Sequence, residues 1–213
     1  MRGGVIAVAA AVVAASAAAW AFALPDRGTS IEAAAQAASA SGPAGHDRLF
    51  LTKAQLDQAI ASGTLDRPVK SLLAVRVPLH FGDYSWNDRG VPAGTTWLRI
   101  DLRSQLISVF RAGHEIGTAV IVYGGDNKQT PAGKLHILAK AQNHRSSLYD
   151  AAMPYTLRLT GDGVSIHASN VSWGAATHGC IGVPMPFAER LFNATRVGDE
   201  VVVVGLPLRA ATA

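Results

Sequence analysis

One stretch near the C-terminal end of the chain concentrates the residues that can do chemistry. It runs from Ser165 to Pro184 and reads SIHASNVSWGAATHGCIGVP. It contains the only cysteine of the 213-residue chain, Cys180, and two of the seven histidines, His167 and His178. A free thiol is a weak nucleophile because its ordinary pKa is about 8.5, and a neighbouring imidazole can take its proton. The stretch therefore predicts a cysteine nucleophile with a histidine base.

The cysteine count narrows the roles open to Cys180. A single cysteine cannot form an internal disulfide. In an oxidising compartment an idle thiol is prone to damage, so its retention beside a histidine and a glycine favours a chemical role. Two other interpretations remain open: a small buried hydrophobic residue, or a zinc ligand together with His167 and His178, although His-x-Cys is not a usual zinc pairing. We expect neither a metal nor another cofactor.

Composition indicates a folded domain that does not bind nucleic acid. Hydrophobic residues make up 49% of the chain and charged residues 16%, which argues against global disorder. The formal net charge of +4 and the pI of about 9.5 give a mild basic bias, compatible with work beside an anionic wall or membrane. The sequence has neither a Lys/Arg run nor a basic stripe interleaved with aromatic residues, so nucleic acid is not an expected partner.

The N-terminus has the pattern of an export signal. Arg2 supplies a positive charge, residues 5–24 are uncharged, and the stretch from Ala21 to Ala23 fits a small-x-small cleavage site. We therefore predict a signal peptide over residues 1–23 and a domain exported to the periplasm or cell envelope. The alternative is an uncleaved segment that tethers the chain to the inner membrane, because about 18 uncharged residues can span a bilayer.

The rest of the chain divides into a linker, an accessory segment, a main domain and a tail. We place them at residues 24–46, 47–94, 95–206 and 207–213. The linker is rich in Ala, Ser and Gly, which predicts a flexible arm. The accessory segment and the main domain carry the patterns of regular secondary structure.

The accessory segment begins with a predicted helix. Thr52 and Gln55 match a capping box within a helix over residues 48–62. Residues 72–80 are largely apolar and predict an edge strand. Residues 82–94 are rich in turn-forming residues and predict a surface loop.

The main domain shows the alternation of apolar and polar residues that is typical of β-strands. We predict strands at residues 98–102, 106–111, 115–123, 134–139, 153–159, 163–167 and 200–205. Residues 142–152 are polar and predict irregular structure. Pro184 and Pro186 precede a short amphipathic helix at residues 187–192. The domain is thus expected to be mainly β, with one or two short covering helices and without a nucleotide-binding glycine-rich loop.

The position of the histidines excludes one class of cysteine hydrolase. All seven histidines precede Cys180, whereas in papain-type enzymes the cysteine comes first, so the base must lie upstream. The residues alone do not choose between His167 and His178. His144 lies in a polar segment that could line a cleft, although a surface position is the favoured interpretation.

Two short motifs, IHA at residues 166–168 and THGCI at residues 177–181, resemble the signature of the L,D-transpeptidases with a YkuD-type catalytic domain. Supporting segments occur in the family's order, at residues 97–110, 130–133, 153–155 and 197–201. The resemblance covers about residues 95–205. It implies a YkuD-like β-sandwich or barrel of mixed strands.

The resemblance also implies roles for the motif residues. Cys180 would be the nucleophile and His167 its base, with the backbone carbonyl of Ala168 holding the other ring nitrogen. Backbone N–H groups around Gly179 and Cys180 would stabilise the oxyanion, and His178 would shape the pocket. Candidate substrate-binding residues are Tyr155, Met153, Trp173, Asn170, Thr177 and Arg158. For the two aromatic residues a packing role, and for the asparagine a role in a turn, explain the sequence equally well.

The family's reaction would then apply to this chain. Such enzymes attack the peptidoglycan stem amide after the L-centre of the diaminoacid, release a terminal D-amino acid, and transfer the acyl group from a thioester to an amine. Stem peptides are therefore the expected donor and acceptor, and carbapenem β-lactams the expected covalent inhibitors. Two alternatives are an L,D-carboxypeptidase or endopeptidase of the same fold, and a catalytically weak wall-binding module.

Three features depart from the family pattern. Ala168 stands where glycine is usual, and the interval between the two motif histidines is short. Gly182 stands where an arginine commonly follows His-Gly-Cys-Ile. An arginine binds carboxylates bidentately, so its absence affects donor recognition. We expect Arg158 or Arg145 to bind the carboxylate in its place.

Overall fold

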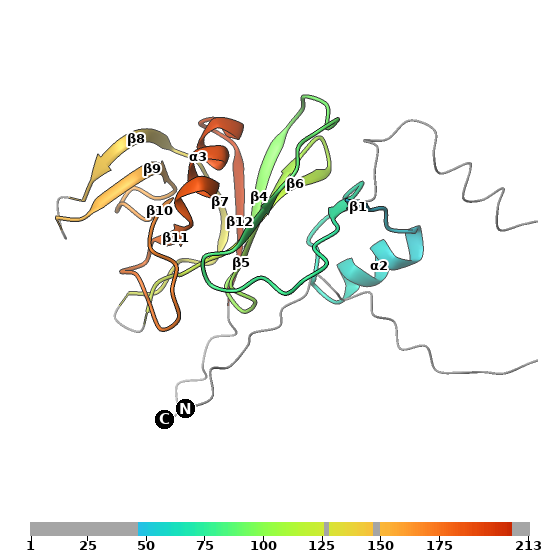
Figure 1. Cartoon of the computed structure of the whole chain (residues 1–213), viewed down its shortest axis with the longest axis horizontal. Coiled ribbons are helices and arrows are strands. Elements are labelled where there is room, and N and C mark those ends of the chain that lie inside the picture. The colour runs from blue at the N-terminus through green and yellow to red at the C-terminus, as the bar shows by residue number, and fades with distance from the viewer. Residues whose placement is uncertain (1–46, 126–127, 147–149, 206–213) are drawn as a thin grey trace, which may run out of the picture.

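The computed structural model describes residues 47–125, 128–146 and 150–205 (Figure 1). Within these ranges the chain forms twelve strands and two helices. The mainly β class with mixed strands and short helices is therefore confirmed. The predicted signal peptide, linker and C-terminal tail lie outside the described residues. In the described part, neither helix is long and apolar enough to cross a membrane.

The larger sheet has six strands. Its order is β3 (Tyr84–Trp86), β6 (His114–Val120), β5 (Leu106–Arg111), β4 (Thr96–Asp101), β12 (Glu200–Val204) and β7 (Gly133–His136). Strands β4 and β12 are parallel, and the other neighbours are antiparallel. This sheet confirms the alternating strands predicted from the sequence between residues 98 and 120.

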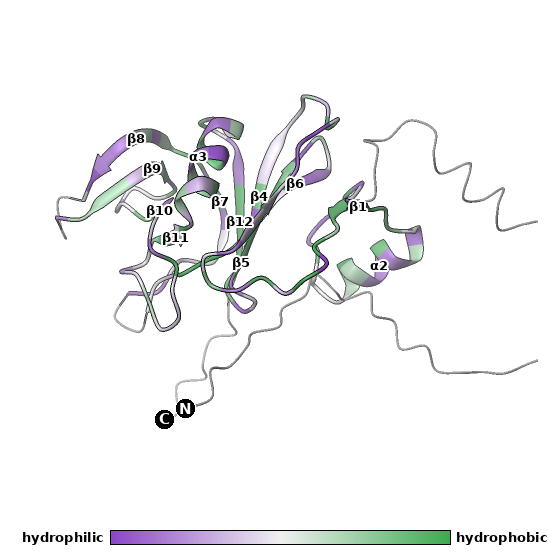
Figure 2. Ribbon diagram, viewed as in Figure 1, coloured by the Kyte–Doolittle hydropathy of each residue, from purple (hydrophilic) through white to green (hydrophobic). Residues whose placement is uncertain are grey.

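The smaller sheet has four strands and carries the cysteine–histidine motif. Its order is β11 (Ile181–Val183), β10 (Ser165–Ala168), β9 (Ala152–Arg158) and β8 (Ala139–Arg145). Strands β10 and β11 are parallel, and the other pairs are antiparallel. Figure 2 shows that β8 is largely hydrophilic, in keeping with its many exposed side chains.

A bridge joins the two sheets beside the motif. The N–H of Gly182 in β11 donates to the carbonyl of Val122, just after β6, at 2.8 Å. The N–H of Val122 donates back to the carbonyl of Gly182 at 3.0 Å. The strand that follows Cys180 is therefore held by both sheets.

One hydrophobic core unites both sheets and the second helix, α3 (Met185–Ala194). Phe187 is fully buried and lies edge-to-face with Trp86 of β3, with 5.5 Å between ring centroids. Burial of a side chain of this size contributes about 1.5–3 kcal/mol. The predicted helix over residues 187–192 is confirmed, with Pro186 in its first turn as expected.

The accessory segment packs on the outer side of the larger sheet. It contains β1 (Arg48–Leu49), α2 (Lys53–Ala61) and β2 (Leu72–Leu73), and in Figure 1 it lies opposite the β8–β9 side. Trp97 and Phe110 of the sheet stack with 4.2 Å between ring centroids, and Leu65 and Val69 of the segment pack against them. The predicted capping box is present: the Thr52 side chain accepts the backbone N–H of Gln55, whose side chain accepts the N–H of Thr52.

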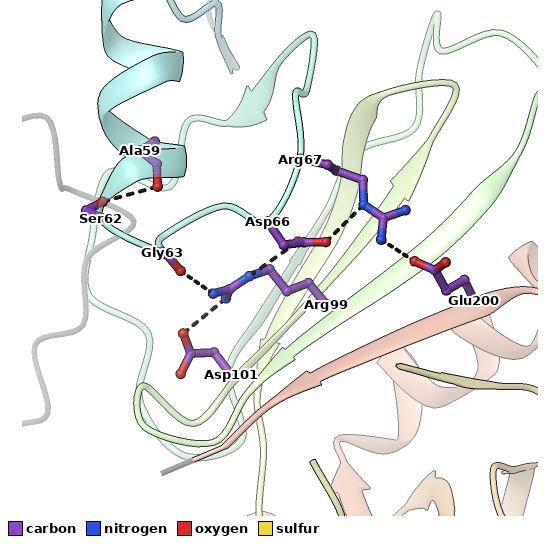
Figure 3. Close-up of polar contacts among 8 residues, drawn as sticks. All are labelled: Ala59, Ser62, Gly63, Asp66, Arg67, Arg99, Asp101 and Glu200. Atoms are coloured by element: carbon purple, nitrogen blue, oxygen red, sulfur yellow. Dashed lines mark hydrogen bonds and ion pairs between the residues drawn. The ribbon is translucent and has the colours of Figure 1, made fainter. Parts of the chain in front are cut away.

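Arginines fix the accessory segment to the sheet (Figure 3). Arg67 pairs with Asp66 and with Glu200 of β12. Its guanidinium lies 4.3 Å from the centroid of the Trp97 ring. Arg99 of β4 pairs with Asp101 at 3.0 Å and donates to the carbonyl of Gly63 at 2.9 Å. These contacts make the segment a structural part of the domain, as opposed to an independent unit.

Three local predictions were wrong, and one strand was not predicted. The strand expected at residues 72–80 is confined to Leu72–Leu73, because the following residues, which include Pro78, pair with no neighbouring strand in the described chain. The loop expected at 82–94 contains β3, which pairs with β6. The irregular segment expected at 142–152 is largely the continuation of β8 into its hairpin with β9. The sequence also did not predict β11, a three-residue strand that exists through its pairing with β10 and Val122.

Candidate active site

The parallel pair β10–β11 brings the two ends of the motif together. His167 in β10 lies opposite Gly182 in β11, and Ile166 lies opposite Ile181. Extending this register by one residue puts Cys180 beside Ser165. Residues two apart in a strand share a face, so this continued register would put the Cys180 and His167 side chains on the same face of the sheet. The chain segment between them closes as a loop.

The thiol of Cys180 is partly buried and protonated at rest. Its sulfur lies 3.9 Å from the carbonyl oxygen of Gly163, toward which the S–H points. Burial raises the pKa of the Cys180 thiol, whereas the backbone N–H of Ser165 and the charge of Lys128 act in the opposite direction, and Asp162 raises it again. Because the pKa is raised overall, the thiol needs a base to become a nucleophile.

His167 is arranged as that base. Its Nδ1 lies 2.8 Å from the carbonyl oxygen of Ala168. A carbonyl only accepts hydrogen bonds, so Nδ1 carries the proton and Nε2 of the neutral ring can accept one. Burial lowers the pKa of His167, the Ala168 carbonyl raises it, and the neighbouring His144 lowers it. The pKa is lowered overall, so the ring is neutral near pH 7.

A threonine outside the central motif holds the loop before the cysteine. The Thr130 hydroxyl donates to the carbonyl of Gly179 at 3.0 Å and accepts the N–H of Gly124 at 2.9 Å. The Thr177 hydroxyl donates to the carbonyl of Cys180. Thr130 was not among the predicted site residues. The signal for it was the Thr-Pro-Ala-Gly segment at residues 130–133, which was noted only as supporting the resemblance.

Two glycines next to Cys180 are required for different reasons. Gly179 has a φ of +96°, in the left-handed region that favours glycine. Gly182 is required by space: a Cβ there would lie 2.7 Å from the Cβ of Ser169 and 2.7 Å from Cγ2 of Val122. The position that commonly holds arginine in the family is therefore closed to any side chain unless its neighbours move.

The β8–β9 hairpin holds several of the predicted substrate-binding residues. Met153 is only 7% exposed, so its side chain packs in the interior. Tyr155 has a φ of +55°, which is uncommon outside glycine, and its ring lies edge-to-face with Phe192 at 5.8 Å between centroids. Near the hairpin end, Arg145 is paired with Asp150 at 2.6 Å. A direct substrate contact by Met153 or Tyr155 stays a prediction.

The other predicted substrate-binding residues differ in exposure. Trp173 is 67% exposed, with its ring edge-to-face against Phe81 at 5.7 Å between centroids. Asn170, His178 and Arg158 are exposed as well, and Thr177 is half-buried. Contact of the exposed side chains with a substrate stays a prediction, whereas the threonine serves the loop through its hydrogen bond to the Cys180 carbonyl.

The zinc alternative requires three or more ligands close together. Among the residues that the structure describes, no group of three or more His, Cys, Asp or Glu side chains is placed to hold a metal ion. His167, His178 and Cys180 are all described, and they do not form such a group. The arrangement of these residues fits a thiol and its base better than a ligand set.

Comparison with known proteins identifies the family of the main domain. The family model of the L,D-transpeptidase catalytic domain, YkuD, matches residues 95–203. L,D-transpeptidase 1 of two Mycobacterium tuberculosis strains is 26% identical over 49% of this chain and 48% of the relative. The chain thus spans about half the length of the curated relatives that it matches.

Solved structures with similar chains are also L,D-transpeptidases. The crystal structure of L,D-transpeptidase 1 from M. tuberculosis is 27% identical, over 52% of this chain and 62% of that one, with a TM-score of 0.47. An L,D-transpeptidase from Stackebrandtia nassauensis is 23% identical, over 55% and 58%, with a TM-score of 0.49. LdtMt1 in complex with imipenem is 24% identical, over 52% and 59%, with a TM-score of 0.48. By the match to the family model, which covers half of its length, the chain belongs to the L,D-transpeptidase (YkuD) catalytic-domain family.

Proposed function

We propose that the protein is a cysteine acyltransferase that remodels peptidoglycan in the cell envelope, with Cys180 as nucleophile and His167 as base. The observation that carries this proposal is the state of His167: Nδ1 is held by the Ala168 carbonyl, so Nε2 can accept a proton, and the pairing of β10 with β11 brings the segment that follows Cys180 beside His167. Family membership supports the reaction type. The donor is a peptidoglycan stem peptide, and the acceptor is an amine.

The first step is acylation of the thiol. Nε2 of His167 takes the proton of Cys180 while the sulfur attacks the carbonyl carbon of the amide after the L-centre of the diaminoacid. The carbonyl oxygen becomes an oxyanion, to which backbone N–H groups around Gly179 and Cys180 donate. The C–N bond then breaks, and His167 gives its proton to the departing amine of the D-amino acid. A thioester remains on Cys180.

The second step is transfer to the acceptor. The acceptor amine attacks the thioester carbon and gives a proton to His167, the C–S bond breaks, and the sulfur recovers that proton as a thiol. The thioester conserves the energy of the original amide, so the new amide forms without ATP. We assign substrate contact to four exposed side chains, those of Trp173, Asn170, His178 and Arg158. Tyr155 and Met153 would form the part of the binding site that β9 contributes.

Intact-mass spectrometry after incubation with imipenem tests the nucleophile and its base. We expect a single covalent adduct on the wild-type protein, none on Cys180→Ala, and on His167→Ala an adduct that forms about 10²- to 10⁴-fold more slowly. His136→Ala is the matched control, because His136 is an exposed histidine of β7, and it should form the adduct normally. A wild-type protein that stays unmodified with its thiol reduced would contradict the proposal and favour a wall-binding module.

Product analysis then tests transfer against hydrolysis. A purified disaccharide-tetrapeptide is incubated with the enzyme, with and without D-methionine. We expect a stem in which D-methionine replaces the terminal residue, because a thioester reacts readily with an amine. A stem that is only shortened, at every D-methionine concentration, would overturn the transferase and establish an L,D-carboxypeptidase.

A further inference from the structure

A lysine and an aspartate from two different loops meet beside Cys180. Lys128 Nζ lies 3.4 Å from Asp162 Oδ2, and the two side chains are 37% and 65% exposed. The stem of Lys128 passes over the loop before the cysteine, since a Cβ on Gly179 would lie 3.3 Å from its Cγ and 3.4 Å from its Cε. The ammonium group is therefore held at the site by packing of its own methylene groups.

Both loops also hold the catalytic segment, so the two charges have fixed places relative to the sulfur. Gly163, the neighbour of Asp162, supplies the carbonyl toward which the Cys180 thiol points. Thr130, two positions after Lys128 in the sequence, binds the Gly179 carbonyl. Both charges act on the thiol in addition to its burial: Lys128 lowers the pKa of Cys180 and Asp162 raises it.

Asp162 is set in place by its own turn. The Thr160 hydroxyl donates to Asp162 Oδ1 at 2.5 Å, and this hydrogen bond lowers the pKa of Asp162, with a further contribution from Lys128. The carboxylate is thus ionised and faces the lysine. An exposed ion pair of this kind is weak, because water competes for both partners. A second carboxylate brought in by a bound peptide can therefore take the lysine from Asp162.

We propose that Lys128 recognises the terminal carboxylate of the donor peptide and that Asp162 occupies Lys128 until the donor binds. This inference rests on the proposed function, in which the leaving group is a D-amino acid. In such a leaving group only the Cα separates the carboxylate from the scissile nitrogen. When the scissile carbonyl is at the sulfur, that carboxylate must lie within a few atoms of it, in the region where Lys128 is held.

The proposal defines a donor class. Stem peptides that end in a free carboxylate directly after the scissile bond bind well, and peptides with an amidated or extended end bind weakly. It also assigns to Lys128 the role that the sequence led us to expect of Arg158 or Arg145. A lysine suits a reversible exchange of carboxylates because its ammonium is a compact point charge on a flexible stem.

Two donors that differ in one group test the proposal. A stem peptide with a free C-terminal D-alanine and the same peptide with a C-terminal D-alanine amide are compared in steady-state release of the leaving group. A hydrogen bond to a charged partner contributes enough for us to expect Lys128→Ala to raise KM for the acid donor by about 10- to 100-fold. We expect KM for the amide donor to change less than about threefold, because Lys128 has no carboxylate to bind in the amide. Any change in kcat through the pKa of Cys180 should be equal for the two donors.

Three further variants sharpen the test. Lys128→Arg should restore most of the affinity for the acid donor, and Asp162→Asn should lower KM for it, since the competing carboxylate is gone. Lys134→Ala removes an exposed lysine of β7 and should change neither donor. Equal losses for both donors in Lys128→Ala would overturn the proposal, and so would an acid-specific loss in Arg158→Ala with Lys128→Ala unaffected.

Binding without turnover separates this inference from the proposed function. Calorimetric titration of the two donors into Cys180→Ala, with and without Lys128→Ala, measures the same preference in the absence of chemistry. Weaker binding of the acid donor alone upon loss of Lys128 supports the inference even if acyl transfer fails, and equal binding of both donors overturns it. Failure of the proposed function instead shows as wild-type protein that forms no imipenem adduct.

Discussion

The two sides of this domain use charged residues in opposite ways. On the accessory side, Arg67 and Arg99 each contact several partners (Figure 3). Arg67 also lies over the ring of Trp97, which stacks with Phe110. On the side of the candidate active site, Lys128 meets Asp162 in a single exposed pair. In Figure 1 the accessory helix α2 and the strands β10 and β11 lie at opposite ends of the domain.

The difference separates charges that hold the fold from charges that are available to a ligand. A planar guanidinium with several partners and an aromatic face under it loses little freedom per contact, so it joins two elements firmly. A lysine in one exposed pair contributes little to stability and can exchange its partner. Substitutions near Cys180 should therefore alter the rate of adduct formation with little change in the free energy of unfolding. Substitutions at the accessory interface should lower the free energy of unfolding with little change in that rate.

The largest expected effect is on rate and comes from His167. His167→Ala should slow formation of the imipenem adduct by about 10²- to 10⁴-fold, the usual contribution of a general base. Its thermal unfolding midpoint should stay within a few degrees of wild type, because His167 is only half-buried. The experiment compares adduct formation over time with a thermal melt. A fall in the rate of adduct formation of less than tenfold, or a large fall in the unfolding midpoint, would contradict the assignment of His167 to catalysis as opposed to stability.

The next effect is on stability and comes from Trp97. Trp97→Ala should lower the free energy of unfolding by about 3–5 kcal/mol, because it leaves a cavity between Phe110 and Arg67. Urea denaturation measures this loss, and below the transition the adduct should form at the wild-type rate. Trp173→Ala is the matched control, since it removes a mostly exposed tryptophan and should cost within about 0.5 kcal/mol. Similar losses in both variants would contradict the assignment of Trp97 to the interface.

Gly182 lies where the two sheets meet, and its substitution should affect both stability and rate. Gly182→Ala introduces a Cβ that must displace Ser169 or Val122, at an expected cost of about 1–3 kcal/mol, and it shifts the segment that follows Cys180. Urea denaturation and adduct formation are measured together. Adding Ser169→Gly should recover part of both losses. Gly161→Ala, at a position with open space around it, should change neither, and an equal cost at the two glycines would refute the steric argument.

The smallest expected effect is on pH dependence. His167 acts as a base only when it is neutral, and its pKa is lowered, so adduct formation should decline on the acid side with a midpoint below about 6.5. His144 contributes to this lowering. His144→Gln should therefore move the midpoint upward by a fraction of a pH unit, and His136→Gln should leave it in place. A midpoint above the ordinary histidine value would mean that a negative charge, and not burial, controls His167.

Elements with a local pattern could be predicted from the sequence. The alternation in β4 and β5, the valine run of β12 and the proline-led helix α3 are properties of consecutive residues, and all four elements are present. Strands β3 and β11 are three residues long and depend on partners distant in the sequence, so no local pattern marked them.

The residues of the candidate site also fall into two groups: those that a local sequence pattern marks, and those that only the fold brings together. Cys180 and His167 stood out because a unique thiol and a histidine motif are visible in one stretch of sequence. Lys128 and Asp162 come from separate loops, and only the fold brings them together. The sequence showed that glycine stands at position 182, where an arginine is common in the family. That Ser169 and Val122 leave no space for a side chain at this position can be seen only from the coordinates.

The bridge between Val122 and Gly182 links reactivity to completion of folding. The strand after Cys180 pairs on one side with β10 and on the other with Val122, so the cysteine reaches its base only after distant parts of the chain have joined. A newly made or partly unfolded chain has the same thiol, but lacks a positioned imidazole to activate it. In the proposed mechanism Cys180 thus becomes reactive only when both sheets are assembled, so formation of the imipenem adduct would report on the integrity of the whole domain.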